Sequence, residues 1–508
     1  MNRRIGVLLS YVLMIFEVLS TLLLTPFIIR TLGQAEYGVY KLTFAINGYI
    51  LLLDLGIGNA TIRYISKYRA NKDKENEGKF FGVVTIYYSI IAILTFIIGL
   101  IITYGFPYIF AKGLTSTEIE LGQKLVFFTM ITSAITLGTS ASNNILIAYE
   151  KFGVSKCSQI VILIMRFIMS FLALKLGLGS LALVIINLIL TIICRLFFVI
   201  YTLVYLKLRP IFKNINKKYI KEIIGYSSMI LLQMVATQLN SSIDQILIGA
   251  LVTSSASILA IYSVGSQINQ YFQSIGSAFN GVLMPGVVKM VESQANEKKL
   301  TDEMIRIGRI VFMVLAPILG IFLVEGQTFV ILWAGRVNES AYLIAVILMS
   351  AYILYLTEAV GTQLLWAKND QKEFTALKFI IVLLNIFFTA TLIKWNAILG
   401  ATIGTFISIF LGDIVVTNVI FYKKLKINLI KYYKELSSGI LPSIIIVIIV
   451  GIVLNNFNSV TWTGFIIKSS ILLIIYLIQM LLFGFNKYEK DLLYSILKIR
   501  NKGEVKNE

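Results

Sequence analysis

The chain consists of long apolar runs separated by short clusters of charged residues, and this pattern limits the folds open to it. Of its 508 residues, 57% are hydrophobic and 14% are charged. A soluble globular protein has roughly 45–50% apolar residues, so a water-soluble fold could not bury this many. A run of roughly 20 apolar residues is long enough to cross a bilayer as a helix. The sequence therefore predicts an all-α integral membrane protein with several membrane spans.

Fourteen apolar runs are expected to form the transmembrane helices. Their limits are 5–29, 37–62, 80–104, 123–148, 157–176, 181–205, 222–250, 258–287, 307–325, 341–366, 375–393, 398–421, 436–454 and 465–485. Helices are favoured over barrel strands because the runs are continuously apolar and do not alternate. The first run is too long for a signal peptide, so we expect it to be retained as a span.

The basic residues orient these spans. Of the 45 lysines and arginines, 35 fall in one set of alternate connections, which includes both termini, and eight fall in the opposite set. Cytoplasmic loops carry the excess of lysine and arginine, so both termini are expected in the cytoplasm. The segments 206–221 and 488–499 mix apolar and basic residues and are expected to be interfacial helices that contact membrane lipids.

A weak internal repeat divides the chain. Tyr37-x-Val39 recurs as Tyr262-x-Val264, and several other short matches are also separated by about 220 residues. Duplicated helical bundles are common in secondary transporters, so we expect two pseudo-symmetric six-helix lobes followed by two additional helices. The expected boundaries are 1–205 for the first lobe, 206–221 for a cytoplasmic linker, 222–421 for the second lobe, 422–485 for the added helices and 486–508 for a cytoplasmic tail.

Several function classes are excluded. The chain has no histidine, which rules out a Ser-His-Asp triad and histidine-based zinc sites. Cys157 and Cys194 lie inside apolar runs and are expected to be small buried side chains, so no metal site and no cofactor is predicted. There is no nucleotide-binding P-loop. The net charge of +19 reflects cytoplasmic loops, and no nucleic-acid partner is expected.

Polar residues repeat along one face of several spans. In span seven, Gln233, Thr237, Asn240, Ser241 and Asp244 share one helical face. Three similar stripes are Ser266, Gln270, Gln273, Ser277 and Asn280 in span eight, Thr129, Ser133, Thr136, Ser140 and Asn143 in span four, and Thr43, Asn47 and Asp54 in span two. Such stripes either join helices by hydrogen bonds or line a hydrated cavity. Four stripes together favour a shared cavity.

Seven charged residues lie well inside the spans, where an ionised side chain is costly without a partner or water. They are Glu17, Asp54, Arg166, Arg195, Asp244, Glu358 and Asp413. Structural ion pairs explain some of them on one interpretation, and a proton- or cation-binding site explains them on the other. Arg63 and Lys289 lie at the cytoplasmic ends of spans two and eight, where a pair of cations would attract a diphosphate.

The opening of the chain resembles a known family. The stretch TPFIIRTLGQAEYGVYKL at 25–42, followed by LLLDLGIGNATIRYIS at 51–66, is similar to the opening of Wzx-type polysaccharide flippases of the multidrug/oligosaccharidyl-lipid/polysaccharide (MOP) exporter superfamily. The resemblance extends over the chain through the expected fourteen-span plan and repeat. It places Arg30 and Arg63 on basic positions of that motif and Asp54 on its acidic position.

The resemblance implies a flippase and not an enzyme. Its substrate would be an undecaprenyl-diphosphate-linked oligosaccharide, moved by alternating access from the cytoplasmic to the outer leaflet of a bacterial cell membrane before polymerisation into capsule or another surface polysaccharide. An ion gradient, of H⁺ or Na⁺, would drive the cycle, and a polysaccharide polymerase is a possible partner. The expected substrate-binding residues are Arg30, Arg63, Lys289, Gln233, Asn240, Gln270, Gln273 and Asn280, and the seven charges inside the spans are the candidates for ion coupling.

Three alternatives stay open on the sequence. A cation-coupled drug or metabolite exporter of the related MATE group would share the two lobes but not the two added helices. A peptidoglycan-precursor flippase would share the whole plan. A membrane glycosyltransferase or polymerase would be expected to carry a D-x-D motif or a sizeable external loop, and the sequence has neither.

Overall fold

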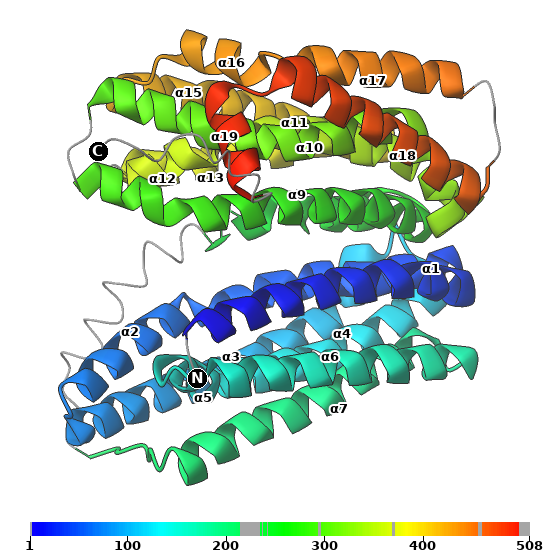
Figure 1. The fold of residues 1–508 in the computed structure, drawn as a ribbon. Helices are drawn as coiled ribbons and strands as arrows, with labels where there is room; N and C mark the ends of the chain where they lie inside the picture. Colours follow the sequence, from blue (N-terminus) through cyan, green and yellow to red (C-terminus); the bar gives the residue numbers. More distant parts are fainter. Residues whose placement is uncertain are drawn as a thin grey trace. The chain divides into compact units, whose positions relative to one another are not determined.

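The computed structural model describes residues 3–213, 234–235, 237–240, 242–292, 296–367, 371–455 and 460–496, and the side chains of these residues except at 3–8, 279–292, 366–367, 371–376 and 492–496. All regular structure in these ranges is helical, which confirms the all-α prediction (Figure 1). The chain divides into two compact units, one formed by Met1–Ser266 with Thr375–Ser408 and the other by Gln267–Phe374 with Ile409–Glu508.

The first unit is built mainly from the N-terminal half of the chain. Its helices are α1 (Arg3–Ile50), η1 (Leu51–Asp54), α2 (Ile57–Ala70), α3 (Lys74–Phe110), α4 (Ser116–Gly138), α5 (Ser140–Ala148), α6 (Phe152–Lys175), α7 (Gly179–Ile200), η2 (Tyr201–Tyr205), the helix Ser242–Leu251, the start of α9 (Ser255–Glu292), most of α13 (Gln371–Leu392) and α14 (Ala397–Ser408). Figure 1 shows α1, α3, α4, α6 and α7 running alongside one another.

The second unit takes the rest of α9 and the C-terminal elements. These are α10 (Glu297–Ala334), η3 (Arg336–Asn338), α11 (Ala341–Thr357), α12 (Ala359–Ala367), η4 (Ile409–Val416), α15 (Thr417–Ile420), η5 (Phe421–Leu425), α16 (Leu429–Ser437), α17 (Ile440–Leu454), α18 (Trp462–Gln479), η6 (Met480–Gly484) and α19 (Lys487–Ile496). Helices α17 and α18, which correspond to the two added spans, pack against α10 and each other.

Local sequence signals explain where several helices begin. Thr115 forms a capping box at the start of α4, because its hydroxyl accepts from the Glu118 N–H while its own N–H donates to Glu118 Oε2 at 2.8 Å. Helices α10, α16 and α18 begin directly after their N-cap residues Asn296, Asn428 and Thr461. In each case the side-chain oxygen of this N-cap residue accepts a hydrogen bond from a backbone N–H of the first turn. At the start of α3, hydrogen bonds from Asn76 hold the pKa of the Asp73 carboxyl below its ordinary value.

Eight helical stretches are long and apolar enough to cross a membrane among the described residues, or ten if two bent pairs each count as one span. The stretch Leu9–Ala70 has 62 residues, and 1.5 Å per residue gives about 93 Å, three times the thickness of a bilayer core. Gly33 interrupts it with φ 76° and ψ 173°, a conformation open to glycine, so this stretch contains the expected spans one and two. The count of fourteen spans remains a prediction.

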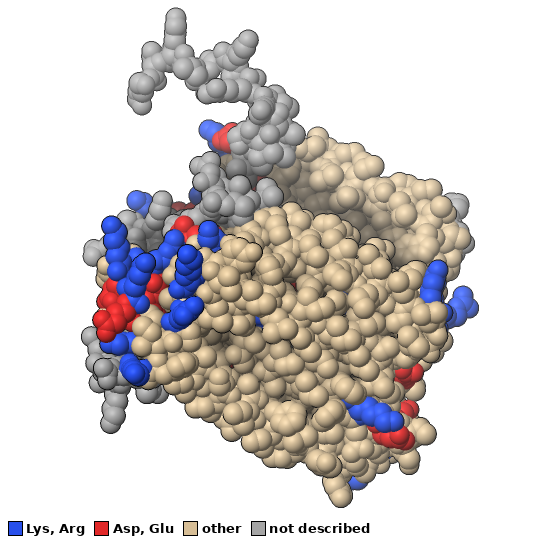
Figure 2. Space-filling view, turned by 90° about the horizontal axis from the view of Figure 1, so that it is seen from below, with Lys and Arg blue, Asp and Glu red and all other residues tan. Residues whose placement is uncertain are grey.

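The surface suits a lipid environment. Large apolar side chains are exposed along α3, α6, α7, α17 and α18, including Ile97, Ile101, Leu196, Ile449 and Ile474. On the face shown in Figure 2, lysine, arginine and acidic side chains gather toward the margins, and a broad band of predominantly uncharged residues lies between them. Exposed apolar surface of this extent is costly in water and favourable in lipid. The chain is therefore a multi-pass membrane protein.

The segment that follows α7 is not the interfacial helix expected for 206–221. Residues 206–213 are not helical, and residues 214–221 lie outside the described part of the chain. The N–H of Ile211 donates to the carbonyl of Gly78 on α3 at 2.9 Å, and Leu208 is buried in a cluster with Ile65 and Phe80. These contacts hold the segment extended against α3, so the prediction was wrong for 206–213. In the tail, the structure has a helix, α19 (Lys487–Ile496), and its expected position at the membrane interface stays a prediction.

Candidate functional site: a cavity with two arginines

The first unit encloses a polar cavity of about 310 Å³, which we call the arginine chamber. Its charged residues are Glu17 from α1, Arg166 from α6 and Arg195 from α7. The lining residues are Leu13, Glu17, Asn143, Gln159, Ile162, Leu163, Arg166, Cys194, Arg195 and Phe198. Two guanidinium groups in one cavity within apolar helices are costly unless they bind something or are hydrated. The chamber thus brings together three of the seven predicted charges.

Helix periodicity explains which side chains meet in the arginine chamber. Gln159, Leu163 and Arg166 lie at i, i+4 and i+7 on one face of α6, and Leu13 and Glu17 are four residues apart on α1. A chain of hydrogen bonds extends this polar wall: Gln159 Nε2 donates to Ser155 Oγ at 3.1 Å, and Ser155 donates to Asn143 Oδ1 at 3.2 Å. The span-four stripe therefore reaches the chamber through Asn143.

Arg166 has a hydrogen-bond donor that is not used within the described residues. Its Nε is buried and makes no hydrogen bond with the described residues. Glu17 and Tyr40 are close enough to interact with it electrostatically, and Cys194 adjoins both arginines. One carboxylate against two guanidinium groups leaves the chamber with an excess of positive charge. Arginine presents its N–H groups in a planar fork that fits the oxygens of a phosphate.

A second cavity of about 190 Å³ shares Leu163 and Arg166 with the chamber. It adds Lys41 and Tyr40 from α1, Asn187 from α7 and the hydroxyls of Ser20, Thr21, Thr25 and Ser170. Lys41 lies over the Tyr37 ring, with Nζ 5.4 Å from the ring centroid. The sequence analysis did not single out Lys41 as a candidate site residue. The signal that could have identified it is its spacing from Tyr37 and Phe44, which lie on the same face of α1.

A carboxylate network forms a separate polar site in the first unit, which we call the Asp244 site. Asp244 is buried, and its carboxylate accepts hydrogen bonds from Tyr262 at 2.6 Å, Thr405 at 2.5 Å and Thr389 at 3.0 Å. Asn385 accepts from Thr389 and donates to Asn240 at 2.7 Å. The site therefore gathers a carboxylate, two amide oxygens and three hydroxyls. Hard cations prefer such oxygen ligands, and a proton can also occupy a carboxylate.

Other predicted polar residues join helices to one another. Asn47 accepts a hydrogen bond from Ser133, which links the stripes of spans two and four, and Asp54 accepts from Tyr88 at 2.7 Å. Tyr88 in turn accepts from Asn144 at 3.4 Å. For these residues the structure matches the first interpretation of the stripes, in which polar side chains hydrogen-bond between helices.

In the second unit, two further predicted acids are buried, Glu358 and Asp413. Glu358 accepts hydrogen bonds from Asn418 at 3.0 Å and from Tyr433. Asp413 lies in η4 and interacts electrostatically with Glu358.

Four of the predicted substrate residues that the structure describes, Arg30, Arg63, Gln270 and Gln273, do not line the arginine chamber. Arg30 and Arg63 are exposed on α1 and α2, and Arg63 lies 5.9 Å from the centre of the Tyr64 ring. Gln270 is exposed and Gln273 half-buried on α9. The side chains of Gln233, Asn280 and Lys289 lie outside the described residues. The roles expected for these residues stay predictions.

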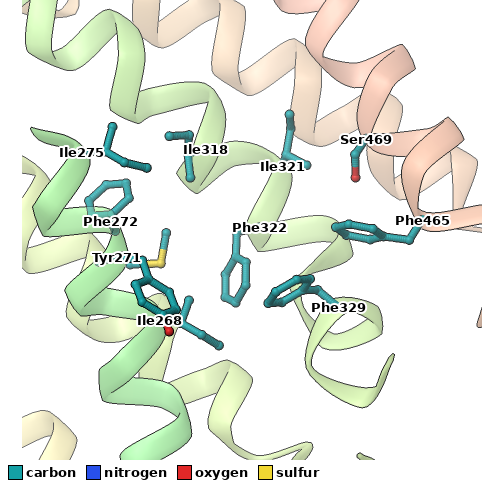
Figure 3. Close-up of a pocket in the computed structure, with 11 residues that line it drawn as sticks. Ile268, Tyr271, Phe272, Ile275, Ile318, Ile321, Phe322, Phe329, Phe465 and Ser469 are labelled. Atoms are coloured by element: carbon teal, nitrogen blue, oxygen red, sulfur yellow. The ribbon is translucent and has the colours of Figure 1, made fainter. Parts of the chain in front are cut away.

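The second unit contains an apolar pocket of about 280 Å³ (Figure 3). Figure 3 shows Ile268, Tyr271, Phe272 and Ile275 on one wall, Ile318, Ile321, Phe322 and Phe329 on another, and Phe465 with Ser469 on a third. These walls come from α9, α10 and α18, and Met349 of α11 completes the lining. A pocket with this lining is suited to hydrocarbon rather than to sugar or phosphate. One of its walls, α18, is the second of the two added helices.

Sequence reasoning missed two ion pairs of the second unit. Lys468 of α18 lies 3.4 Å from the fully buried Glu325 of α10, and Arg309 of α10 is paired with Glu489 of α19 at 2.6 Å. The sequence analysis used Lys468 and Arg309 only within the totals of basic residues that orient the spans. Only the three-dimensional fold shows their partners, because each pair joins residues more than 140 positions apart.

The chain matches the family described as "Polysaccharide biosynthesis protein" over residues 6–291. This match covers more than half of the chain, so the chain belongs to that family, and the expected resemblance is confirmed. No curated protein matches it.

Solved structures with a similar fold are membrane transporters. The chain is similar to "Lipid II flippase MurJ, inward closed conformation", with a TM-score of 0.73 and 16% identity over 97% of this chain and 100% of that one. It is also similar to an inward-facing multidrug resistance MATE transporter of the MOP superfamily, with a TM-score of 0.61 and 15% identity over 80% of this chain and 96% of that one. A third is the MATE transporter DinF-BH, with a TM-score of 0.60 and 16% identity over 83% and 95% of the two chains.

These comparisons define the class of the protein. It is a multi-pass membrane protein of a polysaccharide-biosynthesis family, and its fold is similar to the folds of a lipid II flippase and of MATE transporters of the MOP superfamily. The match to the MurJ structure extends over nearly all of the chain, whereas the MATE match leaves about a fifth of it uncovered. At 15–16% identity, these likenesses concern the fold.

Proposed function

We propose that the protein is a flippase that moves an undecaprenyl-diphosphate-linked oligosaccharide repeat unit from the cytoplasmic to the outer leaflet of a bacterial cell membrane. The product would enter the assembly of capsule or another surface polysaccharide, and a polymerase in the same membrane would take it up. Both termini would lie in the cytoplasm, as the distribution of lysine and arginine suggests. The movement would follow alternating access, in which a site is exposed first to one side of the membrane and then to the other.

The arginine chamber is the observation that supports this proposal most directly. Arg166 and Arg195 supply two guanidinium groups, and Asn143 and Gln159 supply amides that could bind sugar hydroxyls. A diphosphate carries the negative charge and the oxygens that paired guanidinium groups bind best. The carboxylate of Glu17 balances only one of the two guanidinium charges, so the chamber keeps a net positive charge. Arg63 and Lys289 would act earlier, by attracting the diphosphate near the cytoplasmic side, whereas Arg30 would lie at the opposite end of the first span.

The apolar pocket supports a lipid-linked substrate in particular. Its walls of isoleucine and phenylalanine offer no hydrogen-bonding partner for a sugar except at Ser469 and Tyr271. Burial of apolar surface stabilises a bound hydrocarbon by roughly 25 cal/mol per Å². A polyprenyl chain would supply such surface, whereas a free oligosaccharide would not. The pocket thus suits the tail of the substrate, and the chamber suits its headgroup.

The Asp244 site is the best-built candidate for ion coupling. Its carboxylate, two amides and three hydroxyls could hold a proton or Na⁺, and the ion would bias the transport cycle if it bound one conformation more tightly than the other. Glu17 lies in the chamber and would influence the substrate directly. We therefore assign ion coupling to Asp244 ahead of Glu17 and Asp54.

Reconstitution tests this function. Purified protein in liposomes would receive undecaprenyl-diphosphate-linked oligosaccharide in the inner leaflet, and its appearance in the outer leaflet would be followed by accessibility to an external sugar-modifying enzyme. Deletion of the gene in its host should leave single lipid-linked repeat units on the cytoplasmic face and abolish the surface polymer. Accumulation of peptidoglycan precursor, or normal polymer with increased sensitivity to toxic cations, would instead support the precursor flippase or the MATE-type exporter.

A further inference from the structure

A break in the second unit carries a buried carboxylate. Helix α11 ends at Thr357, α12 begins at Ala359, and the two are bent by 45° relative to each other. Glu358 occupies the break, and 2% of its surface is exposed. Ends of helices leave backbone carbonyls without helical partners, and these groups need other donors. The break is therefore a place where neighbouring side chains determine the geometry.

Two consecutive tyrosines of α16 hold the two residues at the break. Tyr432 donates its hydroxyl hydrogen to the carbonyl of Thr357 at 3.0 Å, and Tyr433 donates to Glu358 Oε1. Asn418 adds a second donor to the same oxygen, with Nδ2 3.0 Å from Oε1. The bend thus depends on α16 and on the Glu358 carboxyl group together.

The other oxygens of this cluster lack donors. Glu358 Oε2 and Asn418 Oδ1 are both buried and have no hydrogen-bond partner in the described part of the chain. Buried polar atoms without partners are rare in folded proteins and need an explanation. An ionised carboxylate can only accept hydrogen bonds, whereas a protonated one can also donate. A proton on Oε2 would neutralise the buried carboxylate and turn an acceptor without a donor into a hydroxyl.

The charges around Glu358 favour a proton over an ion pair. Tyr432 and Tyr433 of α16 and Asp413 of η4 are the titratable groups that interact with it from the packed elements. From α10, the uncharged Gly308 lies close to the Tyr432 hydroxyl and the Thr357 carbonyl. From η5, the uncharged Phe421 packs against Gly361. In the described residues, no lysine or arginine pairs with Glu358. A buried carboxylate without a cation is most easily neutralised by a proton.

We propose that Glu358 is a reversible proton-binding site that controls the bend between α11 and α12. With a proton on Oε2, the carboxyl stays buried and the two tyrosines hold the break. When the proton leaves to cytoplasmic water, the carboxylate needs solvent or a cation, and the packing of α16 over the break must change to admit it. This site is separate from the Asp244 site and does not depend on which substrate is carried.

Spin labels across the break test the proposal in the full-length protein. Cys157→Ser and Cys194→Ser would remove the native thiols, and Leu343→Cys and Gln363→Cys would place labels on exposed positions of α11 and α12. The distance distribution between the labels would be measured in lipid nanodiscs from acid to alkaline pH. We expect a pH-dependent shift that Glu358→Gln abolishes, leaving the acid-pH distribution at every pH.

Control variants keep the proposal falsifiable. Glu435→Gln removes an exposed carboxyl from the same α16 and should leave the pH-dependent shift intact. Tyr433→Phe keeps the carboxyl but removes one donor to it, so the midpoint of the shift should move to higher pH; this variant serves if Glu358→Gln does not fold. The proposal is overturned if the shift persists in Glu358→Gln, if wild type shows none, or if the distances at fixed pH respond to Na⁺ in place of H⁺.

Discussion

Arg309 and Glu489 form a buried, two-point ion pair between α10 and α19, with Nε 2.6 Å from Oε1 and the second guanidinium nitrogen 3.0 Å from Oε2. The guanidinium also donates to the carbonyls of Glu435, Ser438 and Gly484. The side chain of Arg309 therefore ties α10 to α19, to the C-terminal end of α16 and to η6. Every N–H group of the Arg309 guanidinium therefore donates a hydrogen bond.

Removal of either partner should destabilise the second unit. Glu489→Gln leaves a buried guanidinium without its counter-charge, and breaking such a pair costs about 3–5 kcal/mol. Thermal unfolding in detergent would show the loss as a lower midpoint. Glu303→Gln is the matched control, because Glu303 forms a partly exposed pair with Arg306 on the same helix and should change stability by at most about 1 kcal/mol. Equal effects of the two variants would contradict this account.

The arginine chamber should determine affinity for the diphosphate. Arg166→Gln and Arg195→Gln each remove a charged donor, and hydrogen bonds to charged groups contribute about 1.5–3 kcal/mol, so binding of the lipid-linked diphosphate should weaken roughly 10- to 100-fold. Binding would be measured by scintillation proximity with radiolabelled undecaprenyl diphosphate. Lys175→Gln removes the same charge from the exposed end of α6 and should change affinity little. Unchanged affinity in both arginine variants would remove the chamber from the substrate path.

The Asp244 site should set the ion dependence of transport. Asp244→Asn removes the charge while keeping the shape, so flipping should lose its response to imposed H⁺ or Na⁺ gradients. Thr405→Val removes one hydroxyl that donates to the carboxylate, and the response should then be weakened rather than lost. Transport in proteoliposomes under each gradient measures both. Glu120→Gln on α4 removes an exposed acid and should leave the response unchanged; an intact response in Asp244→Asn would assign the coupling elsewhere.

The apolar pocket should bind the hydrocarbon part of the substrate. Ile318→Trp would fill part of the cavity, and excluding two methylene groups costs about 1.6 kcal/mol, or roughly a tenfold loss of affinity. Photo-crosslinking with a polyprenyl probe, followed by peptide mapping, would measure occupancy. Ile445→Trp adds the same bulk to an exposed position on α17 and serves as the control. Equal labelling of both variants would argue against tail binding in this pocket.

The contact between α3 and the segment after α7 should depend on the absence of a side chain at Gly82. A Cβ atom there would lie 2.3 Å from the carbonyl oxygen of Ile211, so Gly82→Ala should detach residues 206–212. Hydrogen exchange would detect the change as lost protection of the Ile211 amide. Gly105→Ala on the same helix meets only the end of the Ile109 side chain at 3.9 Å, and protection should persist there.

Much of the fold could be predicted, because hydropathy and charge act along the chain and need no tertiary information. The same holds for the charges inside the spans: Arg166 and Asp244 stand out because an ion in an apolar run is costly wherever its helix packs. Their partners could not be predicted in this way. Periodicity shows that Arg166 shares a face with Gln159, but not that α1 brings Glu17 and Lys41 to that face.

The errors have a common physical cause. The surroundings of Lys41, Arg309 and Lys468 were missed because orientation rules count basic residues without their contacts. The segment 206–213 was expected to be a helix because its apolar and basic residues alternate suitably. Its backbone instead finds a partner in the Gly78 carbonyl, which is accessible because glycine has no side chain. Long-range contacts therefore overrode the local pattern in each case.

The attachment of Ile211 to Gly78 affects how force passes through the chain. A tether that left α7 freely would absorb movement of the residues that follow it by uncoiling. Here, tension applied at residue 213 acts first on the end of α3 near Gly78, through one hydrogen bond and the buried Leu208. A displacement of residues 206–213 is therefore transmitted to α3 and is not absorbed by a free segment.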